Sequence, residues 1–299
     1  MRVFVTGGSG FVGSAVVAEL LSRGHSVLAL ARSEKSIAKL KAAGAEVHGG
    51  TLEDHDSLKA GARACDGIIH LAFIHDFSNY DNSAMVDRAA VETLAGALEG
   101  SDKPLVVTSG TLGVAGSSGT VATEADSGNG SATGRLLTER IALSYAARGV
   151  RSIVVRLPPT VHGDHDWGFV PWIIKAAREA GESGYIGDGL ARWSAVHRLD
   201  AARLFCLALE NGEAGSIFHG VAEEGVAIKE IADVIGRRLS YPVVSLSKEE
   251  AGKRYGFLAK IMQWDSPTSS AKTQEKLSWN PTGPKLLQDL EEGTYFEGA

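Results

Sequence analysis

A glycine-rich turn near the first residues constrains this chain more than any other feature. The segment TGGSGFVG occupies residues 6–13, directly after an apolar run at 3–5. Apolar side chains then recur at helical spacing over 14–23. A strand, a glycine turn and a helix in this order leave backbone N–H groups at a helix N-terminus, where a pyrophosphate can bind. The turn therefore predicts a dinucleotide site in an α/β fold.

The glycines of this turn have separate expected roles. Gly7 permits the tight turn, and Gly10 lets the backbone approach the phosphates. Gly13 allows the helix to pack closely against the strand. Phe11 and Val12 lie between these glycines, so we expect them to contact the bound dinucleotide as well.

Composition argues against several other classes of protein. The formal net charge is −6 and the sequence has no basic run, which disfavours a nucleic-acid surface. No stretch approaches the roughly 20 apolar residues that cross a bilayer. The first strand leads directly into the glycine turn, which is not the pattern of a signal peptide. Cys65 and Cys206 are too few for a disulfide scaffold or a zinc site. We therefore expect no membrane span, no metal and a cytoplasmic location.

Strand and helix patterns alternate along the first half of the chain. The expected strands lie near 2–6, 26–31, 45–48, 67–71, 104–108 and 152–156. The expected helices lie near 12–23, 34–43, 55–62, 84–98 and 134–148. Strands separated by helices predict a parallel, doubly wound sheet, the Rossmann type of α/β fold.

The pattern loosens after residue 157, where prolines and glycines separate shorter elements. Further helices are expected near 199–210, 227–239, 247–254 and 284–292. We predict a nucleotide-binding domain over 1–157. We predict a smaller α/β substrate lobe over 158–299, with segments that return to the first domain.

The end of the second strand indicates which dinucleotide binds. A site built for NAD places a carboxylate about 20 residues after the glycines, on the ribose 2′-hydroxyl. Here the strand ends in Arg32 and Ser33, with no carboxylate at its tip. A guanidinium can bind a 2′-phosphate through paired charge-assisted hydrogen bonds, and Ser33 can add another. The sequence thus favours NADP, and NAD remains possible.

Several further motifs carry a family resemblance over about 200 residues. They are GTLED at 50–54, HLA at 70–72, VTSG at 107–110, RLPPTVHG at 156–163 and VHRLD at 196–200. Together with the glycine turn, they resemble the extended short-chain dehydrogenases/reductases. The resemblance is to the branch that contains dihydroflavonol reductases and NAD-dependent epimerases and dehydratases.

This resemblance implies further cofactor contacts. Thr51 replaces the aspartate that the family places beside the adenine, which leaves Leu52 and the backbone for that contact. The segment after the fourth strand would lie along the ribose and phosphates, which implicates Leu71, Ala72 and Phe73. Pro158 is expected at the cofactor too.

The catalytic motif of the family is altered in this chain. The family uses a Ser or Thr after the fifth strand and a Tyr-x-x-x-Lys motif on the next helix. Alignment on Glu139 puts Arg135 in the lysine position and Ser131 in the tyrosine position. Gly110 falls at the Ser/Thr position. The chain resembles an atypical member, so the usual mechanism does not transfer directly.

The remaining polar groups can still stabilise negative charge on oxygen. Thr111, Ser109 and Arg135 are expected to stabilise an oxyanion, and Arg135 can also bind the cofactor ribose. Ser131 cannot ionise as a phenol does, and a guanidinium does not shuttle protons at neutral pH. Other candidate proton donors follow the fourth and sixth strands: His75, Asp76, Tyr80 and His162. We interpret His162 as a packing residue.

An aromatic group in the second half could form an apolar wall for a substrate. Its members are Trp167, Phe169, Trp172, Tyr185 and Trp193. Asp200 is expected to cap the helix at 201–210.

These observations favour an NADP-dependent reductase that transfers hydride to a carbonyl or enone group of a small apolar or aromatic molecule. Two alternatives stay open. One is an epimerase or dehydratase of the same fold, and the other is a regulator that binds NADP without turnover. The expected assembly is a monomer or a homodimer, and the family resemblance implies dimer faces on helices 84–98 and 134–148.

Overall fold

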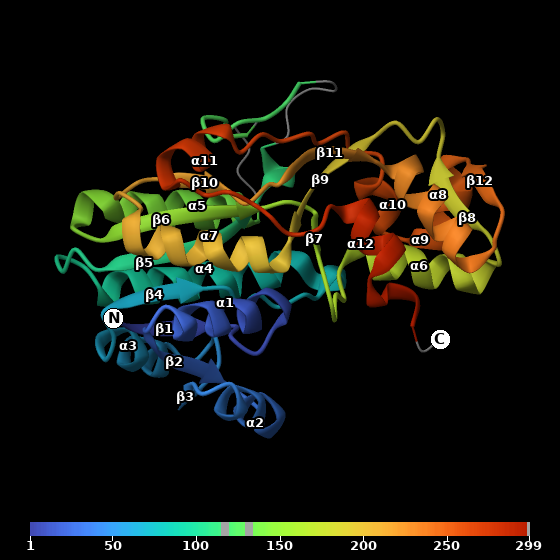
Figure 1. The fold of residues 1–299 in the computed structure, drawn as a ribbon. Coiled ribbons are helices and arrows are strands. Elements are labelled where there is room, and N and C mark those ends of the chain that lie inside the picture. Colours follow the sequence, from blue (N-terminus) through green and yellow to red (C-terminus); the bar gives the residue numbers. More distant parts are fainter. Residues whose placement is uncertain (115–119, 129–133, 298–299) are drawn as a thin grey trace.

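A parallel β-sheet forms the centre of the first half of the chain. The computed structural model describes residues 1–114, 120–128 and 134–297 (Figure 1). Within these residues the main sheet has seven strands, in the order β10-β6-β5-β4-β1-β2-β3, and every pair is parallel. The strands are β1 (Arg2–Thr6), β2 (Ser26–Ala31), β3 (Glu46–Gly49), β4 (Gly67–His70), β5 (Pro104–Gly110), β6 (Arg151–Leu157) and β10 (Ile217–His219).

Helices cover both faces of this sheet because its strands are apolar on both sides. Val3 and Val5 of β1 belong to one core, with side chains of α1, α2 and α7, whereas Phe4 belongs to the opposite core, with side chains of α3, α4 and α5. The helices are α1 (Phe11–Ser22), α2 (Glu34–Ala42), α3 (His55–Arg63), α4 (Tyr80–Ala97), α5 (Arg135–Ser144) and α7 (Arg198–Asn211).

The predicted doubly wound fold is confirmed, and its six predicted strands lie within two residues of the observed bounds. The helix predicted at 84–98 begins earlier, at Tyr80, because its buried stripe already includes Ser83. The helix predicted at 134–148 ends at Ser144 and continues as the 3₁₀ turn η3 (Tyr145–Arg148). The three-residue strand β10 was not predicted, since so short a segment carries no periodicity.

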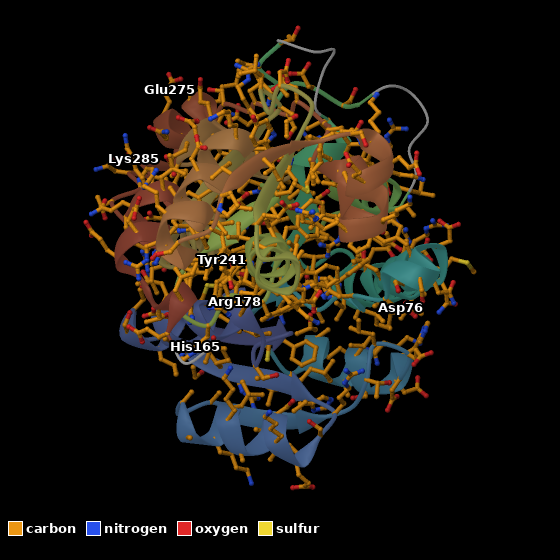
Figure 2. All side chains as sticks on the ribbon, turned by 90° about the vertical axis from the view of Figure 1, so that its right-hand side faces the viewer. Asp76, His165, Arg178, Tyr241, Glu275 and Lys285 are labelled. Atoms are coloured by element: carbon orange, nitrogen blue, oxygen red, sulfur yellow. The ribbon has the colours of Figure 1, made fainter. Side chains whose placement is uncertain are left out.

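A second lobe follows β6, with its own core around Trp193 and Ile231. Its elements are β7 (Thr160–His162), α6 (Phe169–Ala180), β8 (Ser183–Ile186), β9 (Arg192–His197), β11 (Glu223–Ala227), α8 (Ile228–Leu239), β12 (Val243–Leu246), α9 (Lys248–Tyr255), α10 (Leu258–Ile261) and α12 (Leu286–Glu292). Strands β11, β9 and β7 form one small sheet, and β12 and β8 another. Figure 2 shows this lobe from its free side, with Arg178 and Tyr241 labelled.

Several segments from the second half of the chain return to the main sheet. Helix α7 packs beside α1, β10 extends the sheet next to β6, and α11 (Ala271–Leu277) lies against β10 and α7. The chain closes with the 3₁₀ turn η4 (Thr294–Phe296). No helix among the described residues is long and apolar enough to cross a membrane.

Candidate active site

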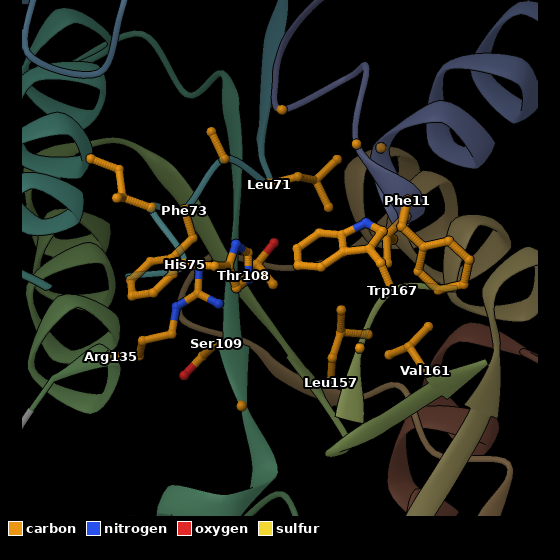
Figure 3. A pocket seen from close by; sticks show the side chains of 18 of the residues that line it. Phe11, Leu71, Phe73, His75, Thr108, Ser109, Arg135, Leu157, Val161 and Trp167 are labelled. Atoms are coloured by element: carbon orange, nitrogen blue, oxygen red, sulfur yellow. The ribbon is translucent and has the colours of Figure 1, made fainter. Parts of the chain in front are cut away.

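One large cavity lies at the carboxyl ends of the parallel strands (Figure 3). Its volume is about 1680 Å³, more than the few hundred to about 1000 Å³ of a typical small-ligand site. Its walls come from the glycine turn, from the segments after β2, β4, β5 and β6, and from the second lobe. Ligands of open parallel sheets bind at this edge, so the cavity is the candidate active site.

The glycine turn forms one end of the cavity. Gly7 has φ +72°, and an added Cβ would lie 2.7 Å from the backbone nitrogen of Ala72. A Cβ on Gly13 would overlap the carbonyl oxygen of Gly7. A Cβ on Gly10 would meet only that same oxygen, at 3.1 Å, and otherwise face open space. Gly7 and Gly13 are thus required by packing, whereas Gly10 leaves room at the cavity.

Backbone N–H donors at the start of α1 lie next to the open space at Gly10. The N–H groups of Phe11 and Val12 have no hydrogen-bond partner among the described residues, and no side chain caps the helix at Gly10. Unpartnered N–H groups at a helix N-terminus attract an anion. The residues present therefore fit the pyrophosphate of a dinucleotide.

The segment after β2 brings a positive charge to the cavity. Arg32 is exposed and lines the cavity together with Thr51 and Leu52. Ser33 does not line it, since its Oγ caps α2 by accepting from the Ser36 backbone N–H at 3.3 Å. Ser33 Oγ is therefore a helix cap that accepts, and its expected hydrogen bond to a 2′-phosphate stays a prediction. Lys39, which belongs to no motif in the sequence, donates from Nζ to the Ser9 carbonyl at 2.8 Å.

The remaining expected cofactor residues also lie at the cavity. The structure brings together Gly7, Gly10, Phe11, Val12, Gly13, Leu71, Ala72, Phe73, Arg135 and Pro158 on its lining. They come from four separate segments of the chain, and the parallel sheet places the ends of those segments side by side.

The expected oxyanion donors differ in their position. Ser109 lines the cavity, and its buried Oγ has no partner among the described residues. Thr111 is 0% exposed and does not line the cavity, because the 3₁₀ turn η2 (Thr111–Gly113) buries its side chain. Its buried Oγ1 also has no partner among the described residues, so its expected role as an oxyanion donor stays a prediction. Ser131 lies outside the described residues.

A buried polar network holds Arg135 in place. Its guanidinium Nη2 lies 3.9 Å from Oδ1 of Asp87, a carboxylate that is only 1% exposed. The same Oδ1 lies 3.2 Å from Nε2 of His70, whose Nδ1 lies 2.9 Å from Oγ1 of Thr6. Burial raises the pKa of Asp87, but the charge of Arg135 and the hydrogen bond with His70 outweigh it and keep the pKa below its usual value. Asp87 is therefore an anion that orients Arg135.

A row of rings crosses the cavity beside this network. The ring centroid of Phe73 lies 5.9 Å from that of Tyr80 and 5.3 Å from that of His75. The ring centroid of His75 lies 4.9 Å from that of Trp167. The guanidinium carbon of Arg135 lies 4.3 Å from the Phe73 ring centre, a cation–π contact. Figure 3 shows Arg135 beside Phe73, with Trp167 and Phe11 across the cavity. Desolvation and the charge of Arg135 lower the pKa of His75.

The second lobe contributes an aromatic wall. Trp167, Phe169 and Trp172 line the cavity as expected, joined by Phe257 and Trp264 from the segment around α10. Tyr185 does not line it, and Trp193 is fully buried in the core of the second lobe. The wall was only partly predictable, because Phe257 and Trp264 reach it through the fold of distant segments.

Carboxylates rather than cations accompany this wall. Burial raises the pKa of Asp166 to about 6, and its Oδ2 accepts a hydrogen bond from the Tyr295 hydroxyl at 2.9 Å. Asp265, also on the lining, forms a bidentate ion pair with Arg192. Among the described lining residues after Arg135 there is no lysine or arginine.

Two residues considered from the sequence prove to be structural. His162 is buried and its Nδ1 lies 2.7 Å from Oδ2 of Asp289, consistent with a packing role. Asp200 does not cap its helix, since His197 occupies the N-cap of α7. Its carboxylate instead accepts from the backbone N–H groups of Thr282 and Gly283, at 3.0 and 2.8 Å.

A comparison with protein families agrees with this geometry. The model of the NAD dependent epimerase/dehydratase family matches residues 3–219. The chain belongs to this family. Its fold is that of the family's NAD(P)-dependent enzymes, which include dehydratases, epimerases and reductases.

Relatives of this family member cover between 73% and 99% of its length in the two cases below. An uncharacterized protein of Schizosaccharomyces pombe is 50% identical over 296 residues, which cover 99% of this chain and 100% of the relative. A ketoreductase of Stigmatella aurantiaca, which acts on a farnesylated dihydroquinoline oxide, is 31% identical over 229 residues, covering 73% of this chain and 67% of the relative.

Solved structures resemble the fold of this family member closely. A dTDP-glucose 4,6-dehydratase of Streptomyces venezuelae with NAD bound has a TM-score of 0.80 at 18% identity, covering 99% of this chain and 97% of that chain. A UDP-glucose 4-epimerase of Thermus thermophilus in complex with NAD has a TM-score of 0.77 at 20% identity, with 100% of both chains covered. At such identities the likeness concerns the fold.

Proposed function

We propose that this family member is an NADP-dependent oxidoreductase that reduces a carbonyl or enone group of a small apolar molecule. The observation that carries the proposal is the two-ended cavity. One end has anion-binding N–H groups and Arg32, and the other end has an aromatic wall without a lysine or arginine among its described residues. The named activities of two relatives, the ketoreductase and a vestitone reductase of Medicago sativa, support it.

Residues from three parts of the cavity wall would hold the cofactor. The N–H groups of Phe11 and Val12 would bind the pyrophosphate, Arg32 the 2′-phosphate, and Arg135 the nicotinamide ribose. When bound, a reduced nicotinamide dinucleotide supplies hydride to a carbonyl or enone carbon. The choice of NADP depends on Arg32, which follows β2 where an NAD site has a carboxylate.

The aromatic wall favours an uncharged substrate over a nucleoside-diphosphate sugar. A diphosphate carries negative charge and requires cations or many N–H donors. The wall instead offers Trp172, Phe257 and Trp264, with the carboxylate of Asp166 nearby on the lining. An apolar or aromatic ketone would bury its surface there without an unpaired charge.

Two groups of the chain can stabilise charge on the substrate oxygen. Ser109 Oγ and the Nε and Nη2 atoms of Arg135 make no hydrogen bond with the described residues. Buried donors of this kind leave capacity for an oxygen that becomes negative. Asp87 Oδ1 lies 3.9 Å from Nη2 of Arg135, so its negative charge attracts the guanidinium toward this side of the cavity.

A regulator that binds NADP without turnover is the second candidate. It is favoured by Ser131 in the position where the family has its tyrosine. Two assays separate the candidates: NADPH oxidation with aromatic ketones and enones, and product formation from UDP-glucose and dTDP-glucose, because epimerisation and dehydration consume no NADPH overall. Oxidation of NADPH with an apolar ketone or enone supports the reductase. Conversion of a nucleotide sugar supports the epimerase/dehydratase, and NADPH binding without any turnover supports the regulator.

Cofactor preference provides a separate prediction. NADPH is expected to bind at least tenfold more tightly than NADH, a difference of about 1.4 kcal/mol. Arg32→Ala should remove most of this preference by removing the charge partner of the 2′-phosphate. Calorimetric titration of both cofactors measures this preference. The control is Arg63→Ala, which removes an exposed arginine of α3. Equal affinities in the wild type would contradict this role for Arg32.

A further inference from the structure

Reduction of a carbonyl to an alcohol requires a proton at oxygen as well as hydride at carbon. Ser131 is a poor acid, and the guanidinium of Arg135 does not release a proton at neutral pH. We propose that the hydroxyl of Tyr80 donates this proton, which makes Tyr80 a catalytic residue contributed by α4 instead of α5. This inference rests on the reductase function proposed above.

The position of Tyr80 carries the inference. Tyr80 lines the cavity and is 38% exposed. Its ring centroid is 5.9 Å from that of Phe73, and Arg135 lies over the same Phe73 ring. The phenol and the guanidinium therefore lie against one shared ring at the edge of the cavity.

The backbone at the start of α5 is shaped around this phenol. Gly134 precedes Arg135 and has φ +54°. A Cβ at this position would lie 2.7 Å from Cε1 of Tyr80 and 3.0 Å from its hydroxyl oxygen. The Tyr80 hydroxyl thus sits at the N-terminal end of α5, next to the residue in the lysine position. Ser131, in the tyrosine position, precedes this helix end by only a few residues.

The electrostatic surroundings of this phenol act on it in opposite directions. Desolvation raises the pKa of Tyr80, so the phenol keeps its proton at neutral pH. The charge and the backbone N–H of Arg135 act in the opposite direction, whereas the carboxylates of Asp87 and Asp81 add to the rise. After proton transfer, the phenolate would face a cation and a helix N-terminus, both of which stabilise it.

The other groups nearby are weaker candidates. His75 has a lowered pKa, so its imidazole is largely neutral and holds no readily released proton at neutral pH. Ser109 can donate a hydrogen bond to the substrate oxygen, but its hydroxyl does not ionise as a phenol does. Tyr80 combines a phenol proton with a neighbouring cation that can stabilise the phenolate.

The proposed step delivers a hydride to the carbonyl carbon and a proton to its oxygen. The reductant is a dihydronicotinamide dinucleotide, which supplies two electrons and the hydrogen that bonds to the carbonyl carbon. The C=O π bond breaks, and its oxygen takes the proton from the Tyr80 hydroxyl to give an alcohol. The Tyr80 phenolate beside Arg135 then regains a proton from water.

Kinetics of Tyr80→Phe test the step. The variant should lower kcat by about 100-fold or more, the usual contribution of a general acid, while the Kd for NADPH stays within a few-fold. Tyr241→Phe, in the second lobe away from the cavity lining, is the matched control and should keep the wild-type rate. An active wild type with full activity in Tyr80→Phe, or loss of activity only in His75→Phe, would overturn the inference. A wild type that turns over no carbonyl compound would overturn the proposed function and the donor role with it.

A second measurement does not depend on turnover. The tyrosinate absorbance of the wild type minus that of Tyr80→Phe isolates the titration of Tyr80. Arg135→Met should raise the pKa of this phenol by about one pH unit, because it removes the neighbouring charge. The same pKa with and without Arg135 would show that the two groups are not coupled, and the inference would fail even if the enzyme reduces ketones.

Discussion

Gly10→Val is expected to weaken NADPH binding at least 100-fold, or about 2.7 kcal/mol, while the protein stays folded. A Cβ at this position meets only the carbonyl oxygen of Gly7, at 3.1 Å, so the backbone tolerates a side chain with a small adjustment. The valine methyl groups would then occupy the space in front of the N–H groups of Phe11 and Val12, where the pyrophosphate would bind. Calorimetric titration measures the affinity, and circular dichroism checks the fold.

A matched control is Gly252→Val in α9, where an added Cβ has no atom within 4 Å. This variant should bind NADPH as the wild type does, since the position lies outside the cavity lining. Normal binding by Gly10→Val would mean that the glycine turn serves packing alone and that the phosphates bind elsewhere.

Glu139→Gln is expected to lower the free energy of unfolding by about 3–5 kcal/mol. Glu139 accepts from Arg156 through both carboxylate oxygens, at 3.0 and 2.5 Å, and the Arg156 side chain is 0% exposed. Removing the negative charge leaves the guanidinium buried with only neutral partners, among them the Asp126 carbonyl at 2.8 Å. Chemical denaturation monitored by fluorescence measures the change.

The exposed pair between Glu99 and Arg148 provides the control, because it has the same bidentate geometry at 2.9 and 2.7 Å. Glu99→Gln should cost less than about 1 kcal/mol, since water screens this pair. Replacing both buried partners, with Glu139→Leu and Arg156→Met together, should recover part of the stability. Equal losses in Glu99→Gln and Glu139→Gln would refute the argument from burial.

Local patterns explain why much of the fold was predictable. The apolar runs of β1, β2 and β5 are buried on both faces, and the helices between them repeat their apolar residues with the helical period. Such signals are contained within a few turns of chain. The glycine turn was equally readable, because Gly7 has φ +72° and Gly13 packs against the Gly7 carbonyl, and both constraints arise within the turn.

The candidate site was less predictable because its members depend on contacts between distant segments. Ser109 and Thr111 are two residues apart, yet Ser109 lines the cavity and Thr111 is buried, which is decided by the 3₁₀ turn after β5. Asp87 could have been noticed as a carboxylate on the buried stripe of α4, but its partners His70 and Arg135 come from other elements.

The amino-acid sequence thus specified the doubly wound sheet and the phosphate-binding turn, since hydrophobic period and glycine geometry act over short distances. It also showed that the tyrosine of the family motif is absent. It left open which polar groups meet in the cavity. The approach of Tyr80 to Gly134 and Arg135, the orientation of Arg135 by Asp87 and the aromatic wall arise only when α4, α5 and the second lobe pack together, because side-chain neighbours from separate segments are set by packing rather than by local preference.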